Sequence, residues 1–276
     1  MKKFIKKNLT TILLVAVFTV GLSLLLYPTF SDWFNTLEAR RILGDYSQAV
    51  AQLNQEDYEK YWKAAEEYNE NLLNKPNRFS PTEGETKEYE ATLDVPGSQV
   101  MAMIRLPSLN SVFPVMHGTS EATLQSNIGH IEGSSLPVGG PSTHAVLSGH
   151  RGLPSAKLFT YLPKLEEGDY FIIEVLDQRL TYQVDKISVV LPEDYSNLQI
   201  EPDQDLVTLM TCTPYGINTH RLLVRGHRVD NLPDDFINTR NEAMLIDSKL
   251  VALFIAVPVL LGLFIWVMVK GRKKKV

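Results

Sequence analysis

The sequence predicts a mainly β domain, a barrel or a sandwich, between two membrane-spanning helices. Three observations predict it: two long uncharged stretches at residues 9–26 and 250–269, several short apolar segments bounded by turn residues within 101–229, and a helix-forming segment ahead of them. Of the 276 residues, 21% are charged and 44% are hydrophobic, which is typical of a folded chain and argues against wholesale disorder.

The first uncharged stretch, 9–26, is long enough to cross a bilayer, because a helix of about 18 residues spans roughly 27 Å. A cleaved signal peptide is the alternative, but no small-residue cleavage site follows Leu26, which favours an uncleaved anchor. The second stretch, 250–269, contains Pro258, which a transmembrane helix tolerates better than a soluble one. A buried core helix is the alternative there, and the uniform apolarity and the basic flank argue against it.

The distribution of charge predicts the orientation of the chain. Basic residues gather in the tails 1–8 and 270–276, directly outside the two apolar stretches. The positive-inside rule therefore predicts that both termini are cytoplasmic and that the region between the spans is extracellular. Every acidic residue lies between Asp32 and Asp247, so this region carries an excess of negative charge. Phosphate binding needs a basic surface, so we expect no nucleic acid among the partners.

The region between the spans divides into segments by composition. Residues 31–74 favour a helical extension, with Gly44 as a break. Apolar side chains recur there at three- and four-residue spacing, which indicates core packing rather than cofactor binding. Residues 75–97 are polar and rich in proline and glycine, which predicts a long loop, a lid for instance. Residues 98–230 form the β domain, and 231–249 a linker to the second span.

The β domain contains six candidate strands, rich in Val, Ile, Leu and Thr. They are residues 100–106, 143–148, 170–175, 180–190, 206–211 and 221–224. Many short strands with turns between them indicate a barrel or a sandwich. The sequence shows no glycine-rich phosphate loop before a helix and no Cys and His at metal-ligand spacing, so we expect no cofactor and no metal.

The single cysteine, Cys212, ends a candidate strand and is followed by a Thr-Pro-Tyr-Gly break. A lone thiol in an extracellular domain is unusual and indicates a reactive group, although a buried apolar cysteine is the alternative. If the chain folds back as a hairpin centred between Gly216 and Ile217, Arg221 lies opposite Cys212 and Arg225 lies further along the strand. The alternative for both arginines is surface charge on an exposed strand.

A thiol reacts at neutral pH when a neighbouring base helps to ionise it, and the usual base is histidine. The chain has six histidines, and the residues alone do not decide which of them meets Cys212. His150 is the best candidate, because Ser-Gly-His-Arg-Gly at 148–152 follows an apolar strand and places the ring at another strand end.

Three motifs in order resemble the sortase family. Thr-Leu-Met-Thr-Cys at 208–212, followed by Arg221, is similar to the sortase signature, and Thr-His-Ala-Val-Leu-Ser-Gly-His-Arg at 143–151 is similar to the segment that carries the sortase histidine. The resemblance covers roughly residues 30 to 270. It implies a closed sortase β-barrel with Cys212, His150 and Arg221 around one groove.

Within the family the chain resembles class C, the pilus-assembling sortases. The anchors at both ends, the helical extension and the segments 117–140 and 212–221 carry this resemblance. Class C enzymes typically have a lid with an Asp-Pro-aromatic motif, and the corresponding residues here are Asn77, Arg78 and Phe79. Because a neutral Asn77 forms no charge-assisted contact with an arginine, we expect a looser lid, or none.

The resemblance implies a cysteine transpeptidase that cleaves a Leu-Pro-x-Thr-Gly-like sorting signal between Thr and Gly. Cys212 forms the acyl-enzyme, His150 transfers protons and Arg221 stabilises the oxyanion. The expected partners are pilins or surface proteins with C-terminal sorting signals, a pilin lysine as acceptor, and the membrane. The alternatives are a housekeeping sortase that uses a cell-wall amine, a membrane-bound cysteine peptidase that releases product to water, and a non-catalytic scaffold.

Overall fold

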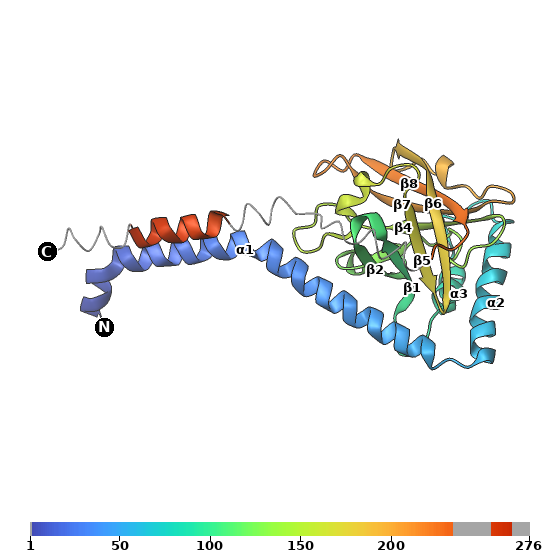
Figure 1. Ribbon diagram of the computed structural model, residues 1–276, viewed down its shortest axis with the longest axis horizontal. Coiled ribbons are helices and arrows are strands. Elements are labelled where there is room, and N and C mark those ends of the chain that lie inside the picture. Colours follow the sequence, from blue (N-terminus) through green and yellow to red (C-terminus); the bar gives the residue numbers. More distant parts are fainter. Residues whose placement is uncertain (1, 234–254, 267–276) are drawn as a thin grey trace. The chain divides into compact units, whose positions relative to one another are not determined.

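A computed structural model describes residues 2–233 and 255–266 (Figure 1). The described residues fall into two compact units, residues 2–33 with 255–266, and residues 34–233. The predicted tail 270–276, most of the predicted linker 231–249 and the ends of the predicted span 250–269 lie outside the described residues.

One helix in the described part of the chain, within Thr11–Ala51, is long and apolar enough to cross a membrane. It belongs to α1, which runs from Lys2 to Ala51. Near the other terminus, Ile255–Trp266 forms a shorter apolar helix, and in this first unit the rings of Phe18 and Phe264 stack with their centroids 4.3 Å apart.

The helical extension breaks at a different place from the predicted one. Gly44 lies inside α1, because a single glycine costs only about 1 kcal/mol in a helix of otherwise good helix formers. The break comes before α2, Gln55–Leu72, where the Asn54 side chain accepts a hydrogen bond of 2.9 Å from the Asp57 N–H.

The recurring apolar side chains of the extension pack into the core, as predicted. Tyr68 and Leu72 of α2 are buried, and so is Tyr46 of α1. The Tyr46 hydroxyl donates to the carbonyl of Met101 at 3.2 Å and accepts from the N–H of Leu176 at 2.8 Å, so α1 is hydrogen-bonded to two parts of the β domain. Burial raises the pKa of Tyr46.

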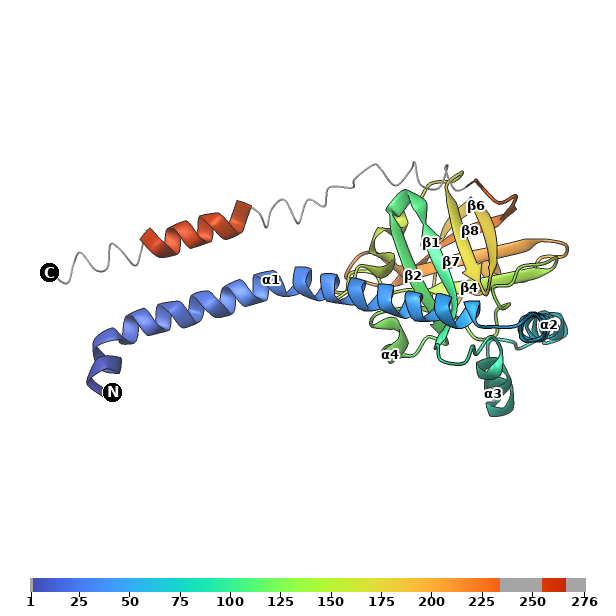
Figure 2. The same cartoon turned by 60° about the horizontal axis from the view of Figure 1, so that its bottom comes forward.

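The segment 75–97 is not a loop throughout, contrary to the prediction. It contains α3, Glu83–Ala91, which begins with a capping box: Glu85 N–H donates to the Thr82 hydroxyl, and Thr82 N–H donates to the Glu85 carboxylate at 2.8 Å. This hydrogen bond, with Lys75, lowers the pKa of Glu85 to about 2. Figures 1 and 2 show α2 and α3 on the same side of the β domain.

The β domain is a closed barrel with strand order β1-β2-β3-β4-β7-β8-β6-β5. The strands are β1 Val100–Leu106, β2 Ser111–His117, β3 Ile128–His130, β4 Thr143–Ser148, β5 Tyr170–Val175, β6 Gln178–Val190, β7 Asp205–Thr213 and β8 His220–Val229. The short helices are η1 Pro107–Leu109, α4 Glu121–Leu124, η2 Leu158–Lys164 and η3 Ser196–Leu198. The six predicted strands are present, and the prediction missed β2 and β3.

Two faces of the barrel wall bury different apolar clusters. Leu147 of β4 and Leu209 of β7 belong to the main core. Their neighbours in the sequence, Val146 of β4 and Met210 of β7, belong with Leu223 of β8 to a second cluster. Because successive side chains of a strand point to opposite faces, this second cluster lies on the outer face of β4, β7 and β8.

Candidate active site

Cys212 and Arg221 are paired across the β7–β8 hairpin. The register places Cys212 opposite Arg221 and Met210 opposite Leu223, so the predicted centre of the hairpin is confirmed. By alternation along the two strands, Cys212 and Arg221 share the outer face of Met210 and Leu223. Cys212 is a free, half-buried thiol, and directly opposite residues of an antiparallel pair have Cβ atoms about 5 Å apart.

His150 follows β4, which runs parallel to β7, so the loops after both strands leave the same end of the barrel. Two hydrogen bonds join the start of the loop after β4 to strand β7. Gly149 N–H donates to the Met210 carbonyl at 3.1 Å, and the Thr211 hydroxyl donates to the Gly149 carbonyl at 2.7 Å. A Cβ at position 149 would approach Phe159 to 2.8 Å, so only glycine allows this close approach. His150 is thereby fixed beside the strand end that carries Cys212.

The ring of His150 is mostly enclosed, with 28% of its side chain exposed. Its Nε2 atom is buried and has no hydrogen-bond partner among the described atoms. The carboxylate of Glu121 in α4 lies close to it, with Oε2 3.9 Å from Nε2.

The residues after His150 pack on the residues after Cys212. Arg151 donates to the Thr213 hydroxyl at 3.1 Å, and its guanidinium lies over the Tyr215 ring at 5.8 Å. Gly152 has φ +84, and a Cβ there would lie 2.7 Å from the Tyr215 ring. The sequence alone did not predict this contact.

The two arginines of β8 have different surroundings. The Arg221 guanidinium donates to main-chain carbonyls of its own hairpin, Asn218 and His220, each at 3.3 Å. Arg225 instead forms ion pairs with Asp185 at 3.0 Å and Glu201 at 2.8 Å. Arg225 is therefore a structural residue, and Arg221 is the arginine beside the thiol.

The buried histidines have structural roles. The Nδ1 atom of His130 lies 2.9 Å from the Tyr89 hydroxyl, and His144 lies 2.7 Å from the Thr208 hydroxyl. Burial lowers the pKa of each to about 4, so both are neutral at physiological pH. The other three histidines are not fully buried. His117 contacts the Thr92 carbonyl, His220 contacts the Thr219 hydroxyl, and His227 lies 3.5 Å from the Asp185 carboxylate.

Arg78 anchors the candidate lid segment at two points. It donates to the carbonyl of Leu198 at 2.6 Å and to that of Gly133 at 3.2 Å, and it is 8% exposed. Gly133, at φ +85, is in direct contact with the Arg78 backbone, which a side chain at 133 would prevent. The expectation of a looser segment rested on Asn77 alone and did not include these hydrogen bonds.

Phe79 packs against the outer cluster of the barrel. It contacts the group formed by Val146, Leu198 and Leu223, and its ring stacks on Tyr195 at 5.0 Å. The candidate lid segment therefore lies over the same outer face of β4 and β8 that carries Arg221.

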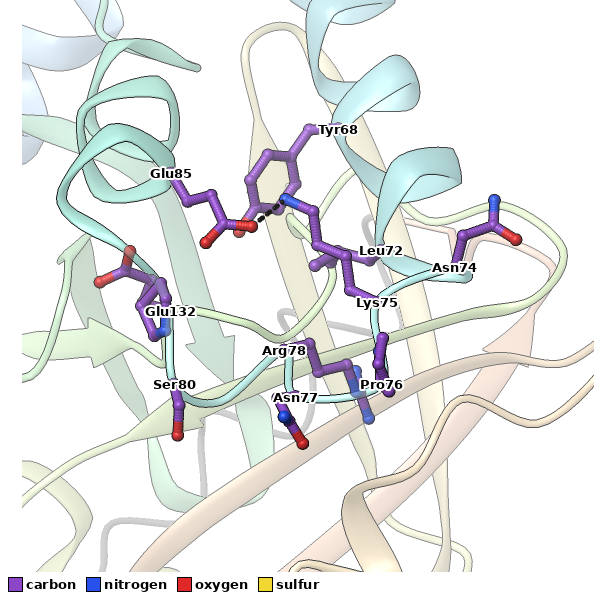
Figure 3. Close-up of a pocket in the computed structure, with 11 residues that line it drawn as sticks. Tyr68, Leu72, Asn74, Lys75, Pro76, Asn77, Arg78, Ser80, Glu85 and Glu132 are labelled. Carbon is purple, nitrogen blue, oxygen red and sulfur yellow. Dashed lines mark ion pairs between the residues drawn. The ribbon is translucent and has the colours of Figure 1, made fainter.

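A cavity of about 210 Å³ lies behind this segment, between it and the helices α2 and α3 (Figure 3). Lys75 and Glu85 form an ion pair of 3.0 Å across it. Its lining includes Arg78 and Glu132 but none of Cys212, His150 and Arg221. In the described part of the chain, no group of three or more His, Cys, Asp or Glu could hold a metal ion.

The chain is similar to known proteins of one family. The family model of the sortase domain matches residues 104–229. Sortase SrtE1 of Streptomyces coelicolor is 27% identical over 228 residues, 78% of this chain and 56% of its own length, so the chain spans just over half of that relative. Sortase D of Bacillus subtilis is 27% identical over 160 residues, 56% of this chain and 78% of its own length.

Several solved structures share a higher sequence identity with this chain than these two relatives do. Sortase C1 of Streptococcus agalactiae is 48% identical with a TM-score of 0.67, over 70% of this chain and 100% of that one. Sortase C-1 of Actinomyces oris is 46% identical with a TM-score of 0.59, over 62% and 98%. Sortase C of Streptococcus pneumoniae is 41% identical with a TM-score of 0.63, over 70% and 99%. This chain belongs to the sortase family and is most like its class C members.

Proposed function

We propose that this protein is a membrane-anchored cysteine transpeptidase that joins a sorting signal to a pilin lysine. It cleaves a Leu-Pro-x-Thr-Gly-like signal between Thr and Gly. The observation that carries the proposal is the register that sets Cys212 opposite Arg221 at the barrel end where His150 also lies. These are the residue types that a thiol-based acyl transfer needs.

Each of the three residues has a distinct chemical role in this proposal. The Cys212 thiolate attacks the threonine carbonyl and forms a thioester. Arg221 donates hydrogen bonds to the oxyanion that develops there, which its position beside the thiol supports. His150 protonates the leaving glycine amine and later takes a proton from the incoming amine. The thioester conserves the energy of the cleaved peptide bond for the second step.

The pilin lysine is proposed as the acceptor because of the class C likeness. The structure of sortase C of Streptococcus pneumoniae is described as giving insights into pilin substrate specificity. Another similar structure is described as sortase C1 of GBS pilus island 1. A housekeeping role, with a cell-wall peptide amine as acceptor, uses the same chemistry up to the thioester. The acceptor therefore has to be found by experiment.

The proposed membrane arrangement uses the two apolar helices Thr11–Ala51 and Ile255–Trp266. We propose that both span the bilayer with the termini in the cytoplasm and the barrel outside. The apolar part of α1 and the stacking of Phe18 on Phe264 support this arrangement. An enzyme held at the membrane meets membrane-held substrates at a high effective concentration.

The segment Asn77, Arg78 and Phe79 is proposed to cover the substrate groove. Its support is the packing of Phe79 on the outer cluster and the anchoring of Arg78. A substrate would have to displace Phe79 to lie along β7 and β8.

The test is product analysis with the full chain in detergent micelles. The protein is incubated with a sorting-signal peptide and either a lysine-containing pilin peptide or a cell-wall-type peptide amine, beside a Cys212→Ala control. A ligated product that depends on Cys212 and forms preferentially with the lysine supports the proposal. Preference for the cell-wall amine indicates a housekeeping sortase, and hydrolysis with either amine indicates a peptidase.

A further inference from the structure

The carboxylate of Glu121 and the ring of His150 face each other but form no hydrogen bond. Glu121 Oε2 lies 3.9 Å from His150 Nε2, which is longer than a hydrogen bond. Nε2 is buried and has no hydrogen-bond partner among the described atoms. A buried polar atom without a partner is costly, so Nε2 is available to accept a hydrogen bond from a substrate group.

Close backbone packing fixes both sides of the gap on β3. A Cβ at Gly129 would collide with the Gly118 carbonyl and approach Thr119 to 3.2 Å, so glycine lets the chain before Glu121 lie directly on β3. On the other side, a Cβ at Gly149 would lie 2.6 Å from Ile128 of β3. The barrel therefore fixes the backbone segments that carry Glu121 and His150.

The Glu121 side chain lies on the solvent-exposed side of this gap. Glu121 is the first residue of α4, which Ser120 caps by accepting from the Thr123 N–H at 3.2 Å. Its side chain is 75% exposed, so the carboxylate is able to move aside and uncover Nε2. Glu121 thus places a carboxylate at the surface, next to His150, the base candidate of the site.

We propose that the gap between Glu121 and His150 binds the ammonium group of the acceptor. The inference rests on the proposed function and names the subsite for its second substrate. A nitrogen placed about 2.9 Å from each atom fits a separation of 3.9 Å. An alkylammonium has three N–H donors, so it can donate one hydrogen bond to the Glu121 carboxylate and another to the lone pair of His150 Nε2.

The second step of the reaction balances at this position. The ammonium gives one proton to His150 Nε2 and attacks the acyl carbon on Cys212 as a neutral amine. The C–N bond forms, the C–S bond breaks, and the second proton of the amine goes to the departing sulfur. One proton stays on the amide nitrogen, and His150 returns its proton to water. The Glu121 carboxylate accepts a hydrogen bond from the amine and holds the amine beside the base until the amine attacks.

The test compares charged and uncharged nucleophiles on the same acyl-enzyme. The full chain in detergent micelles is acylated with a sorting-signal peptide. It is then titrated with Nα-acetyl-lysine amide, a primary ammonium, or with hydroxylamine, which is uncharged at neutral pH. The ratio of nucleophile product to hydrolysis product is measured for the unmodified chain, for Glu121→Gln, and for Glu193→Gln, an exposed acid of the loop after β6 as the matched control.

We expect Glu121→Gln to lower the lysine-to-hydrolysis ratio about tenfold and the hydroxylamine ratio by less than about twofold. Glu193→Gln should behave as the unmodified chain. An equal loss with both nucleophiles would mean that Glu121 orients His150 and does not bind the ammonium. No loss with either nucleophile would mean that the acceptor does not bind at Glu121. Each of these results overturns the proposal. Failure of the unmodified chain to form any acyl-enzyme is visible before an acceptor is added, and it overturns the proposed function together with this subsite.

Discussion

The Thr211 hydroxyl donates a hydrogen bond of 2.7 Å to the carbonyl of Gly149. Thr211 precedes Cys212 and Gly149 precedes His150, so one contact joins the two segments that carry the thiol and the base. Cys212 lies near the end of β7 and His150 directly follows the parallel strand β4, so the backbone positions both residues. Such positioning is more rigid than a contact between long side chains.

Thr211→Val should therefore weaken both folding and catalysis. The valine keeps the shape of threonine but leaves the buried Gly149 carbonyl without its donor, which costs about 1–3 kcal/mol. We expect a lower free energy of unfolding in urea and an acylation rate lower by about tenfold. Thr211→Ser, which keeps the hydroxyl, should remain close to the unmodified protein; equal behaviour of the two variants would contradict this role.

The two arginines of β8 should separate catalysis from stability. Arg221→Ala should lower the acylation rate by about 100-fold, the size of effect seen for an oxyanion donor, with little change in unfolding. Arg225→Ala leaves Asp185 and Glu201 without their cation and should cost about 2 kcal/mol of stability. Measuring the acylation rate and urea unfolding of each variant checks both predictions. A large loss of acylation in Arg225→Ala and a large loss of stability in Arg221→Ala would contradict the assignment of Arg221 to catalysis.

Removing the Arg78 anchor should expose the thiol. Arg78→Met leaves the carbonyls of Gly133 and Leu198 without a donor and frees Phe79 to leave the outer cluster. If opening becomes easier by about 1.4 kcal/mol, the rate of Cys212 alkylation by iodoacetamide rises about tenfold.

Lys75→Met is the matched control for that experiment. It removes a cation from the same segment, but the ion pair of Lys75 with Glu85 is about one-third exposed and contributes little. An alkylation rate that is the same in Arg78→Met and in the unmodified chain would show that Phe79 does not cover the thiol.

The stability of the barrel should fall on acidification below about pH 6.5. Burial lowers the pKa of His130 and of His144 to about 4 in the folded state, against an ordinary value of about 6.5. The unfolded chain therefore binds more protons between these values, and stability is lost as the pH falls through this window, by roughly 3 kcal/mol for each histidine.

Urea unfolding at several pH values between 4 and 7 measures this slope. His130→Asn should flatten it, since one of the two buried groups no longer titrates. A slope unchanged by that substitution would mean that other groups determine the acid sensitivity.

Much of the site follows from local sequence, and the remainder depends on distant partners. The Cys212 and Arg221 pairing was predictable because a short hairpin fixes its own register. The capping box of Thr82 and Glu85 was present in the sequence, yet the surrounding prolines and glycines led to the prediction of a loop. The strand β3 has three residues, which is too short for an alternation pattern to be recognised.

The positions of Arg78 and Glu121 were not predictable from their own segments. Arg78 bonds to carbonyls of Gly133 and Leu198, and main-chain carbonyls leave no signature in a sequence. Glu121 comes near His150 because two glycines allow close packing on β3, which only the folded barrel shows.

The most direct measurement of the central claim is peptide mapping of the acyl-enzyme. The full chain is incubated with a sorting-signal peptide without acceptor, quenched in acid, digested and analysed by mass spectrometry. The account predicts a thioester to the threonine carbonyl on the peptide that contains Cys212, absent in Cys212→Ala and much reduced in His150→Ala. A cleaved signal peptide with no adduct on Cys212, or an adduct on another residue, would contradict it.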